Sequence, residues 1–325
     1  MTMTQRMINL KRKELAVKQN ALHTPWGGAV LAALLLVAML IPSQGLAKLR
    51  VVTTLPDFAQ LVEELGGERV ESQALIQGTE DAHFVDPKPS HVVRLNQADM
   101  VVLIGLDLEI GWLPTLLRQC RNATLQPGSI GYFDASTAIV PKEVPLNIDR
   151  SMGDLHPGGN PHYYTSPLEM KRVAEALSAR LMKMDPEGKA VYQSLLEAFR
   201  AKYARKMEEW STAAAPLKGK NVVQYHKGWA YLLDWLGMKS VGALEPKPGI
   251  PPSASHVTKL LRLVQSQNVE FVLQTVYESK RLSKVFASKS GAKLLVMPSM
   301  VGSYPDVKTI WDKWDKMIAM LTESK

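Results

Sequence analysis

The stretch GKAVYQSLLEAFRAKYARKMEEWSTAA, residues 188–214, decides the fold of this chain. Large apolar side chains recur in it at steps of three and four residues, which is the spacing of one face of an α-helix. They are Tyr192, Leu195, Leu196, Phe199, Tyr203, Met207 and Trp210. The pattern predicts one amphipathic helix of about 27 residues and roughly 40 Å. Charged runs such as residues 202–209 are expected on its solvated face.

Short β-branched runs alternate with helical patterns on both sides of this helix. Before it, we expect strands at 48–54, 70–75 and 99–104 and helices at 57–65, 90–97 and 167–184. After it, we expect strands at 221–225, 239–244, 270–274 and 293–297 and helices at 227–236, 253–267 and 305–322. Residues 133–160 read as a long loop. The predicted fold is therefore α/β, with two lobes, each a mainly parallel sheet flanked by helices, joined by one long rigid helix.

The first 47 residues have the pattern of an export signal. A basic head precedes the uncharged run Trp26–Pro42, and Gly45-Leu46-Ala47 is a small-residue site at which we expect cleavage. The apolar core is about 13 residues, shorter than the roughly 20 that span a bilayer. Because the head is long for a signal, an uncleaved inner-membrane anchor is the alternative. The expected organisation is a signal at 1–47, an N-terminal lobe at 48–187, the linking helix at 188–214 and a C-terminal lobe at 215–325, in a periplasmic protein.

Composition excludes some partners. Removal of residues 1–47 takes away five basic side chains and one acidic side chain, so 39 Lys and Arg become 34 and 31 Asp and Glu become 30. The remaining net charge is small, and no dense basic stripe with interleaved aromatics is present. Nucleic acid is therefore a poor candidate partner. The single cysteine, Cys120, lies in a helical pattern and is expected to be a buried or half-buried structural thiol.

Three histidines share a setting at predicted strand exits. His83 lies in GTEDAHFVDPKPS, His162 in HPGGNPHYYTSP and His226 in VVQYHKGWAYLL. Ligands of open α/β sheets bind beyond the carboxyl ends of the strands, so such residues point into a cleft. Imidazole suits zinc, copper, nickel and iron, and three imidazoles nearly complete a tetrahedral site. Their spacings match no short zinc motif, so a surface or capping role for each is the competing interpretation.

The motifs around these histidines resemble those of a known family. DAHFVDPKPS is similar to the DPHxYEPxPS loop of the zinc- and manganese-binding periplasmic receptors of ABC importers. GNPHYYTSP, VVQYHKGWAYLLDWLGM and the segment Glu245–Leu261 resemble later motifs of that family, in the same order, over nearly all of residues 49–325. The resemblance implies two lobes bridged by a rigid helix, with a metal buried between them. It implies metal-ligand roles for His83 and His162 in the first lobe and His226 in the second.

The chain departs from the family at the fourth ligand. Many members supply a carboxylate from the exit of the last strand, whereas here the segment is LLVMPSMVGSY and the matching place holds Met297 or Pro298. The fourth position is then expected to be water or a carboxylate such as Asp306, although Asp306 is better explained as a cap of the closing helix. Three imidazoles with few oxygens favour Zn²⁺ over Mn²⁺ or another divalent transition metal.

The other histidines and aromatic residues have structural interpretations. His156 either supports the site or makes a hydrogen bond within its loop, and the second is the simpler expectation. His91 and His256 lie near predicted helix starts and are expected to face solvent. Trp229, Tyr231 and Trp235 are expected to form core of the second lobe.

The expected function is capture of a divalent metal and its delivery to the membrane permease of an ABC importer by a monomeric protein that is not an enzyme. An adhesin or metallochaperone on the same fold is one alternative. An exported hydrolase with a three-histidine zinc site is another, but it needs a general base beside the bound water. The nearest carboxylates in sequence, Asp81, Asp86 and Asp154, show no HExxH-like pairing with the histidines.

Overall fold

The computed structural model describes residues 48–146, 156–247 and 249–323. The predicted export signal at residues 1–47, and Asp154, lie outside this part of the chain. Within it, no helix combines the length and the apolar character needed to cross a membrane.

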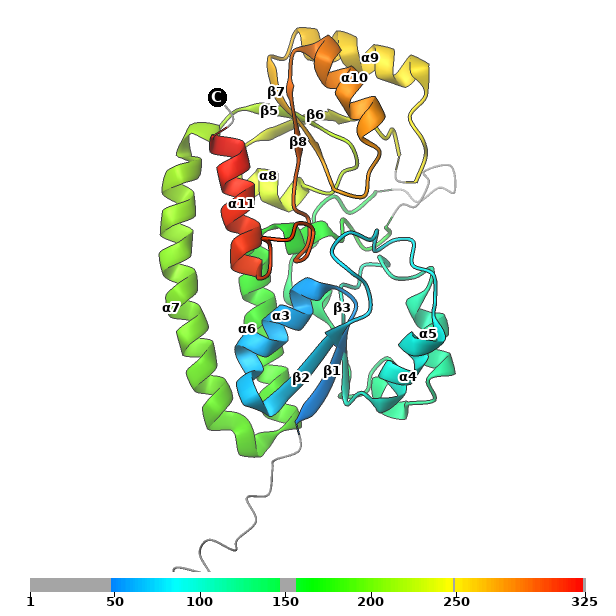
Figure 1. Cartoon of the computed structure of the whole chain (residues 1–325), viewed down its shortest axis with the longest axis vertical. Helices are drawn as coiled ribbons and strands as arrows, with labels where there is room; N and C mark the ends of the chain where they lie inside the picture. The colour runs from blue at the N-terminus through cyan, green and yellow to red at the C-terminus, as the bar shows by residue number, and fades with distance from the viewer. Residues whose placement is uncertain (1–47, 147–155, 248, 324–325) are drawn as a thin grey trace, which may run out of the picture. The chain divides into compact units, whose positions relative to one another are not determined.

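The first lobe is built on a parallel sheet of four strands in the order β2-β1-β3-β4 (Figure 1). The strands are β1 (Leu49–Thr53), β2 (Val70–Ala74), β3 (Met100–Leu103) and β4 (Tyr132–Asp134). Val51 of β1 pairs with Ser72 on one side and with Met100 on the other. Because all four strands are parallel, their carboxyl ends and the loops that follow them lie at one edge of the sheet.

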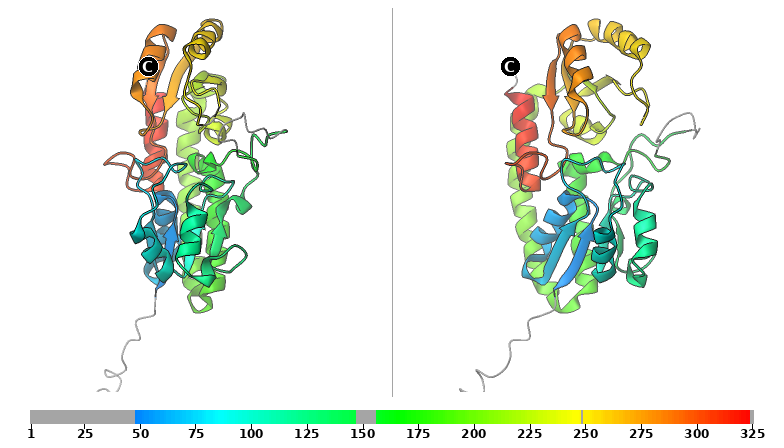
Figure 2. Two further views of the ribbon diagram at one scale, coloured as in Figure 1. Left: turned by 90° about the vertical axis from the view of Figure 1, so that its right-hand side faces the viewer. Right: turned by 45° about the vertical axis from the view of Figure 1, so that its right-hand side comes forward.

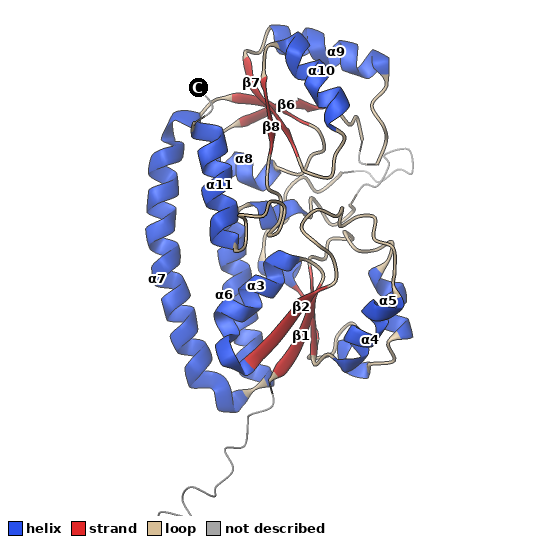
Figure 3. Cartoon of the chain, in the orientation of Figure 1, coloured by secondary structure: helices blue, strands red, loops and turns tan. Residues whose placement is uncertain are grey.

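The second lobe repeats this plan with the order β6-β5-β7-β8, again all parallel. Its strands are β5 (Asn221–Gln224), β6 (Lys239–Ala243), β7 (Val269–Gln274) and β8 (Lys293–Val296). In both sheets the first strand of the lobe is central, so ligand-binding loops gather beside it. Figure 3 shows the two sheets as separate groups of strands with helices around each.

The helices of the first lobe are α3 (Pro56–Gly66), α4 (Pro89–Gln97), α5 (Leu113–Gln119) and α6 (Pro167–Met184). Those of the second are α8 (Ala230–Leu236), α9 (Ala254–Gln265) and α10 (Lys280–Ser290). The helix α7 (Lys189–Ala214), of 26 residues, connects the two lobes in sequence and lies beside α3 and α6 (Figures 1 and 2). It buries five of the predicted stripe residues, namely Tyr192, Leu196, Phe199, Tyr203 and Trp210. The predicted long helix is confirmed.

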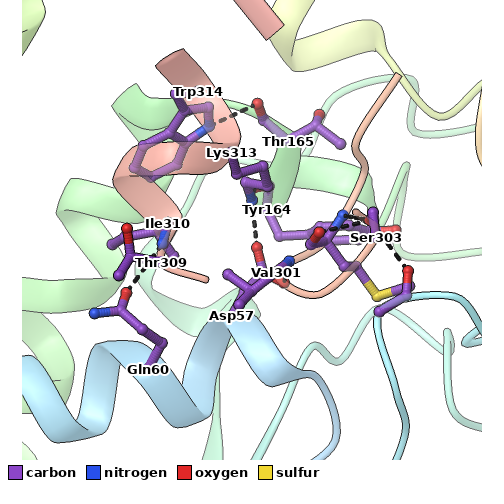
Figure 4. A network of polar contacts seen from close by, with 12 residues as sticks. Asp57, Gln60, Tyr164, Thr165, Val301, Ser303, Thr309, Ile310, Lys313 and Trp314 are labelled. Carbon is purple, nitrogen blue, oxygen red and sulfur yellow. Dashed lines mark hydrogen bonds and ion pairs between the residues drawn. The ribbon is translucent and has the colours of Figure 1, made fainter. Parts of the chain in front are cut away.

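The last helix, α11 (Ile310–Thr322), follows the second sheet in sequence but packs against α7 and α3. Lys313 and Asp57, both fully buried, form an ion pair between α11 and α3 (Figure 4). Lys313 Nζ also donates to the Tyr164 carbonyl at 2.8 Å, and Asp57 Oδ2 accepts from the Val301 backbone at 3.0 Å. These contacts tie the C-terminal segment to the first lobe.

One apolar core extends through both lobes. It joins Phe58 and Val101 of the first lobe to Leu232 and Leu273 of the second, together with Trp314 of α11. A smaller cluster around Val223 and Phe286 lies under α9 and α10. A continuous core between lobes resists their separation, because opening it would expose apolar surface to water.

Several sequence predictions about packing can now be compared with the structure. Cys120 is buried, as predicted. Trp229 and Tyr231 are buried and Trp235 is half-buried, so their assignment to the core is confirmed. The Tyr231 hydroxyl also contacts the 133–160 loop, where it donates to the Asn160 carbonyl at 2.7 Å. The strand β4, of three residues, and the helix α10, of 11 residues, were not predicted from the sequence.

The closing helix begins later than predicted, at Ile310 rather than at residue 305. Thr309 and Asp312 form a capping box, with the Asp312 backbone N–H donating to the Thr309 hydroxyl and the Thr309 N–H to the Asp312 carboxylate. Asp306 is exposed and pairs with Lys316 at 2.6 Å. It therefore neither caps the helix nor lies at the histidines, and both expectations for Asp306 are wrong.

Candidate metal centre

His83 lies in the loop between β2 and α4, at the carboxyl edge of the first sheet. Its Nδ1 is 2.7 Å from Asp81 Oδ1, which also accepts from the His83 backbone at 3.0 Å. Trp112 Nε1 donates to the Ala82 carbonyl at 2.9 Å and so fixes the loop to the first-lobe core. His83 Nε2 is buried and makes no hydrogen bond with the described residues. The carboxylate therefore orients the ring and leaves Nε2 free.

His162 opens a short 3₁₀ helix, His162–Thr165, immediately before α6. The residue is buried, and its Nδ1 lies 3.1 Å from the Tyr164 hydroxyl. Its backbone N–H donates to Asn160 Oδ1 at 2.9 Å. The Asn160 amide donates in turn to the Lys227 carbonyl at 2.8 Å, so the loop that carries His162 is bonded to the loop that carries His226.

His226 follows β5, the central strand of the second sheet, and precedes α8. Its Nδ1 is 2.5 Å from Glu245 Oε2, in the segment after β6. The His226 and Glu245 side chains are 14% and 15% exposed, so the pair is screened from bulk water. As at His83, a carboxylate holds Nδ1 and directs Nε2 towards the cleft.

The three rings converge on one point. The ring centroids are 5.1 Å apart for His83 and His162, 5.3 Å for His83 and His226 and 5.0 Å for His162 and His226. Zn–N bonds of about 2.0–2.1 Å in tetrahedral arrangement place bound imidazole centroids about 5.2 Å apart. One nitrogen from each ring lies within 4.8 Å of the others. The ring centroids thus match the spacing expected for three imidazoles on a single tetrahedral metal.

The electrostatics favour unprotonated imidazole at the centre. Burial lowers the pKa of His162 well below its ordinary value, and the neighbouring His226 and His83 add to this effect. Burial also tends to raise the pKa of Asp81, but the hydrogen bond and charge of His83 outweigh it and the pKa is lowered. An ionised Asp81 beside His83 and a neutral His162 are the forms that a metal site needs.

A polar pocket adjoins the rings on one side, lined by Asp81, His83, His226, Glu245, Tyr277 and Glu278. Burial raises the pKa of Glu278 to about 8, opposed by hydrogen bonds from Thr275 and supported by the charges of Glu245 and Asp81. Glu278 Oε2 accepts from the Thr275 backbone at 2.7 Å. The site therefore has more oxygen nearby than the sequence suggested, and the expectation of few oxygens needs this correction.

Sequence reasoning missed the roles of Asp81, Glu245 and Glu278. Glu278 follows β7 by four residues, so the same strand-exit argument that found the histidines could have found it. In the sequence, Asp81 stands out only as a carboxylate near His83, and Glu245 only as part of a motif similar to one of the family. Met297, at the place of the family's usual carboxylate, is buried, and its backbone N–H donates to the Gln274 carbonyl at 2.7 Å.

The remaining histidines behave differently from one another. His91 is only 4% exposed, so its predicted solvent-facing position is wrong. Its Nδ1 accepts from the Lys88 backbone at 3.3 Å, which turns the ring back over the helix start. His256 is half-buried, with Nε2 2.9 Å from the Ala243 carbonyl oxygen, so it too is not simply solvent-facing. Asp86 is exposed.

His156 lies beside His83, with ring centroids 5.4 Å apart.

A comparison with known protein families assigns the chain to one family. The family model described as zinc-uptake complex component A, periplasmic, matches residues 51–324. The high-affinity zinc uptake system protein ZnuA of Bacillus subtilis (strain 168) is 24% identical over 260 residues, which are 78% of this chain and 79% of that protein. The manganese ABC transporter substrate-binding lipoprotein PsaA of Streptococcus pneumoniae is 24% identical over 224 residues, 68% of this chain and 70% of that protein.

Solved structures share the fold. The cadmium-bound periplasmic metal-binding protein of Candidatus Liberibacter asiaticus superposes with a TM-score of 0.71 at 18% identity, covering 85% of this chain and 99% of that one. At this identity the likeness concerns the fold alone. It confirms the prediction of two parallel-sheet lobes with flanking helices and a long helix between them.

Proposed function

Because the chain belongs to the family of zinc-uptake complex component A, periplasmic, we propose that it captures a divalent transition metal outside the cytoplasm and delivers it to an ABC importer. The observation that carries this proposal is the convergence of three imidazole rings from two lobes, with centroids 5.0–5.3 Å apart. The family is one of transport receptors and not of enzymes. That supports the receptor function over an adhesin or a metallochaperone.

His83, His162 and His226 are the proposed ligands, each binding through Nε2. The Nδ1 partners are Asp81, the Tyr164 hydroxyl and Glu245. A hydrogen bond from Nδ1 fixes the ring orientation and the tautomer, and an anionic partner raises the basicity of the bound nitrogen. A metal held by residues from both lobes would bridge the cleft between them.

Zinc is the metal we propose, and manganese is the less favoured candidate. Imidazole nitrogen suits zinc, whereas manganese is bound mainly by carboxylate, carbonyl and water oxygens. Relatives named for zinc and for manganese both occur, so family membership does not choose between the two metals. The nitrogen-rich centre favours zinc, because the Asp81 and Glu245 oxygens nearest the rings are hydrogen-bonded to imidazole Nδ1 atoms.

The described carboxylates at the histidines do not suit the role of a hydrolytic base. A zinc hydrolase needs an unprotonated carboxylate or imidazole beside the metal-bound water. Asp81 and Glu245 are each engaged with a histidine, and burial raises the pKa of Glu278 to about 8, so it is mainly protonated at neutral pH. These three carboxylates therefore fit the binding function better than catalysis.

The wider organisation is part of the same proposal. Residues 1–47 would direct export, by a cleaved signal or as an uncleaved inner-membrane anchor, and the protein would work in the periplasm as a monomer. Residues 48–187 and 215–325 would form the two lobes and residues 188–214 the linking helix. The partner would be the membrane permease of the importer.

Metal content tests the proposal. The protein purified without added metal should carry one zinc per chain by elemental analysis, and zinc should displace manganese in competition at equal concentrations. Ester and peptide hydrolysis should stay at the buffer rate. Retention of manganese against zinc would overturn the metal assignment, and turnover of an ester or peptide would overturn the receptor function.

A further inference from the structure

A fourth imidazole, that of His156, lies at the edge of the three-histidine cluster. Its ring centroid is 5.4 Å from that of His83 and 6.5 Å from that of His162. The first distance matches the separation of about 5.2 Å expected for two imidazoles on one tetrahedral zinc, and the second exceeds it by roughly 1 Å. His156 lines two hollows, one with His83 and one with His162, and does not line the pocket that holds Glu278.

The two ring nitrogens of His156 have different environments. Nε2 is buried and has no hydrogen-bond partner among the described residues. The ring does make a hydrogen bond to the backbone of Leu106. Because Nε2 is unpartnered, that bond belongs to Nδ1. An Nδ1–H held by a backbone carbonyl, with an unshared electron pair on a buried Nε2, is the arrangement in which metal-binding histidines occur. A buried polar atom with no partner otherwise costs free energy.

Backbone hydrogen bonds and a glycine with positive φ define the turn that carries His156. The Gly159 backbone donates to the His156 carbonyl at 3.0 Å, and the Asn160 backbone to the Lys142 carbonyl at 2.8 Å. Gly159 has φ of +111°, and a Cβ there would lie 2.8 Å from the Lys142 carbonyl oxygen. Only glycine fits that position. The same turn continues into Asn160, which orients His162, so one short segment of the chain carries both His156 and His162.

The carboxylates near the three histidines are poorly placed to become the fourth ligand of the metal. Asp81 and Glu245 each hold an imidazole Nδ1, and a carboxylate that moved to the metal would release the ring that it orients. Glu278 has one oxygen bonded to the Thr275 backbone. Beyond the three proposed ligands, His156 Nε2 is the one histidine nitrogen or carboxylate oxygen among the described residues around the cluster that is buried and has no hydrogen-bond partner.

We propose that His156 is the fourth zinc ligand and completes an all-imidazole site with His83, His162 and His226. The inference rests on the proposed function, since it adds a ligand to the same centre. It requires His156 to approach His162 by roughly 1 Å when the metal binds. Four nitrogen ligands with no carboxylate would strengthen selection of zinc against manganese, which prefers oxygen.

Nitrogen-15 NMR of zinc-loaded protein labelled at histidine tests this assignment, because a zinc-bound Nε2 differs in chemical shift from a free one. Four zinc-bound histidines are expected in the unchanged protein and three in His156→Ala and His156→Asn. Zinc affinity, measured by competition with a chelator, should fall about tenfold or more in both variants. The Asn variant keeps a hydrogen-bonding side chain in the turn, so agreement between the two variants excludes a general disturbance of the loop.

A matched variant completes the experiment. His256→Ala removes a histidine outside the cluster and should leave four zinc-bound signals. Three bound histidines in the unchanged protein, with no change in His156→Ala, would overturn the role of His156 while leaving the proposed function intact. Loss of all zinc-bound histidine signals in the unchanged protein would instead overturn the proposed function itself.

Discussion

The Nε2 atoms of His162 and His226 lie 3.0 Å apart and share a hydrogen bond, although the two residues are 64 positions apart in sequence and belong to different lobes. A hydrogen bond between two imidazole nitrogens needs one proton between them. A metal bound by both atoms must replace this proton, because only an unprotonated nitrogen is a ligand. Zinc binding at both Nε2 atoms would therefore release this proton.

The carboxylates that hold the ligand rings should control zinc affinity. Asp81→Asn and Glu245→Gln keep the shape of each side chain but remove the negative charge beside Nδ1. Zinc binding should weaken by about 10- to 100-fold in each variant, because neutral partners orient the ring less firmly and make Nε2 less basic. Chelator competition measures the change. Glu270→Gln, which breaks only a surface pair with Lys220, is the matched control and should bind as the unchanged protein does.

The raised pKa of Glu278 predicts that replacing this residue changes the folding stability by an amount that depends on pH. Burial raises that pKa to about 8, so between the ordinary value near 4.5 and pH 8 the unfolded chain loses this proton while the folded protein keeps it. Glu278 therefore lowers folding stability as pH rises through that window. Relative to the unchanged metal-free protein, Glu278→Gln should become more stable from pH 5 to pH 8, by at most about 1.4 kcal/mol per pH unit. Denaturant unfolding at several pH values measures it, and a difference independent of pH would contradict the assignment.

The buried pair of Lys313 and Asp57 should be a main anchor of the C-terminal segment. Lys313→Met leaves the Asp57 carboxylate buried and without its cation, which typically costs about 3–5 kcal/mol of unfolding free energy. The double variant Asp57→Leu with Lys313→Met should recover part of this loss, since no unpaired charge remains. Lys316→Ala, which breaks the exposed pair with Asp306, should be nearly silent. Equal destabilisation by Lys313→Met and Lys316→Ala in chemical denaturation would refute the anchoring role.

The lobes should move little when zinc binds. The helix α7 packs against α3, α6 and α11, and the apolar core is continuous through both lobes. Bending α7 would break backbone hydrogen bonds, and separating the lobes would expose apolar surface. Solution scattering should therefore give nearly the same radius of gyration with and without zinc, with hydrogen exchange changing most around His83, His162 and residues 298–304. Compaction by several ångströms would indicate a flexible clamp instead.

The sequence predicted the elements well because their periodicities are strong, as in α7 with its aromatic and leucine stripe. It did not predict that α11 leaves the second lobe. Periodicity identifies the apolar face of a helix but not its partner, and here the partner is set by Asp57, 256 residues away. His91 was misjudged for a similar reason, since its position at a helix start says nothing about the side chain folding back over Lys88.

The same limit applies to the candidate site, where the histidines could be predicted from the sequence but the residues that orient them could not. Strand-exit positions and the family resemblance brought His83, His162 and His226 into one hypothesis, and the structure brings these three rings together. The groups that orient them were harder to foresee. Glu245 reaches His226 only because β6 pairs with β5, and Tyr164 reaches His162 only because the short 3₁₀ helix turns its hydroxyl back.

The central claim, that His83, His162 and His226 hold the metal, is tested most directly by zinc titration of the unchanged protein, the three single Ala variants and the triple variant. The unchanged protein should bind one zinc per chain. Each single variant should bind at least about tenfold more weakly, equivalent to about 1.4 kcal/mol, and the triple variant should show no tight site while it stays folded by circular dichroism. One zinc bound per chain by the triple variant, with the affinity of the unchanged protein, would contradict the account.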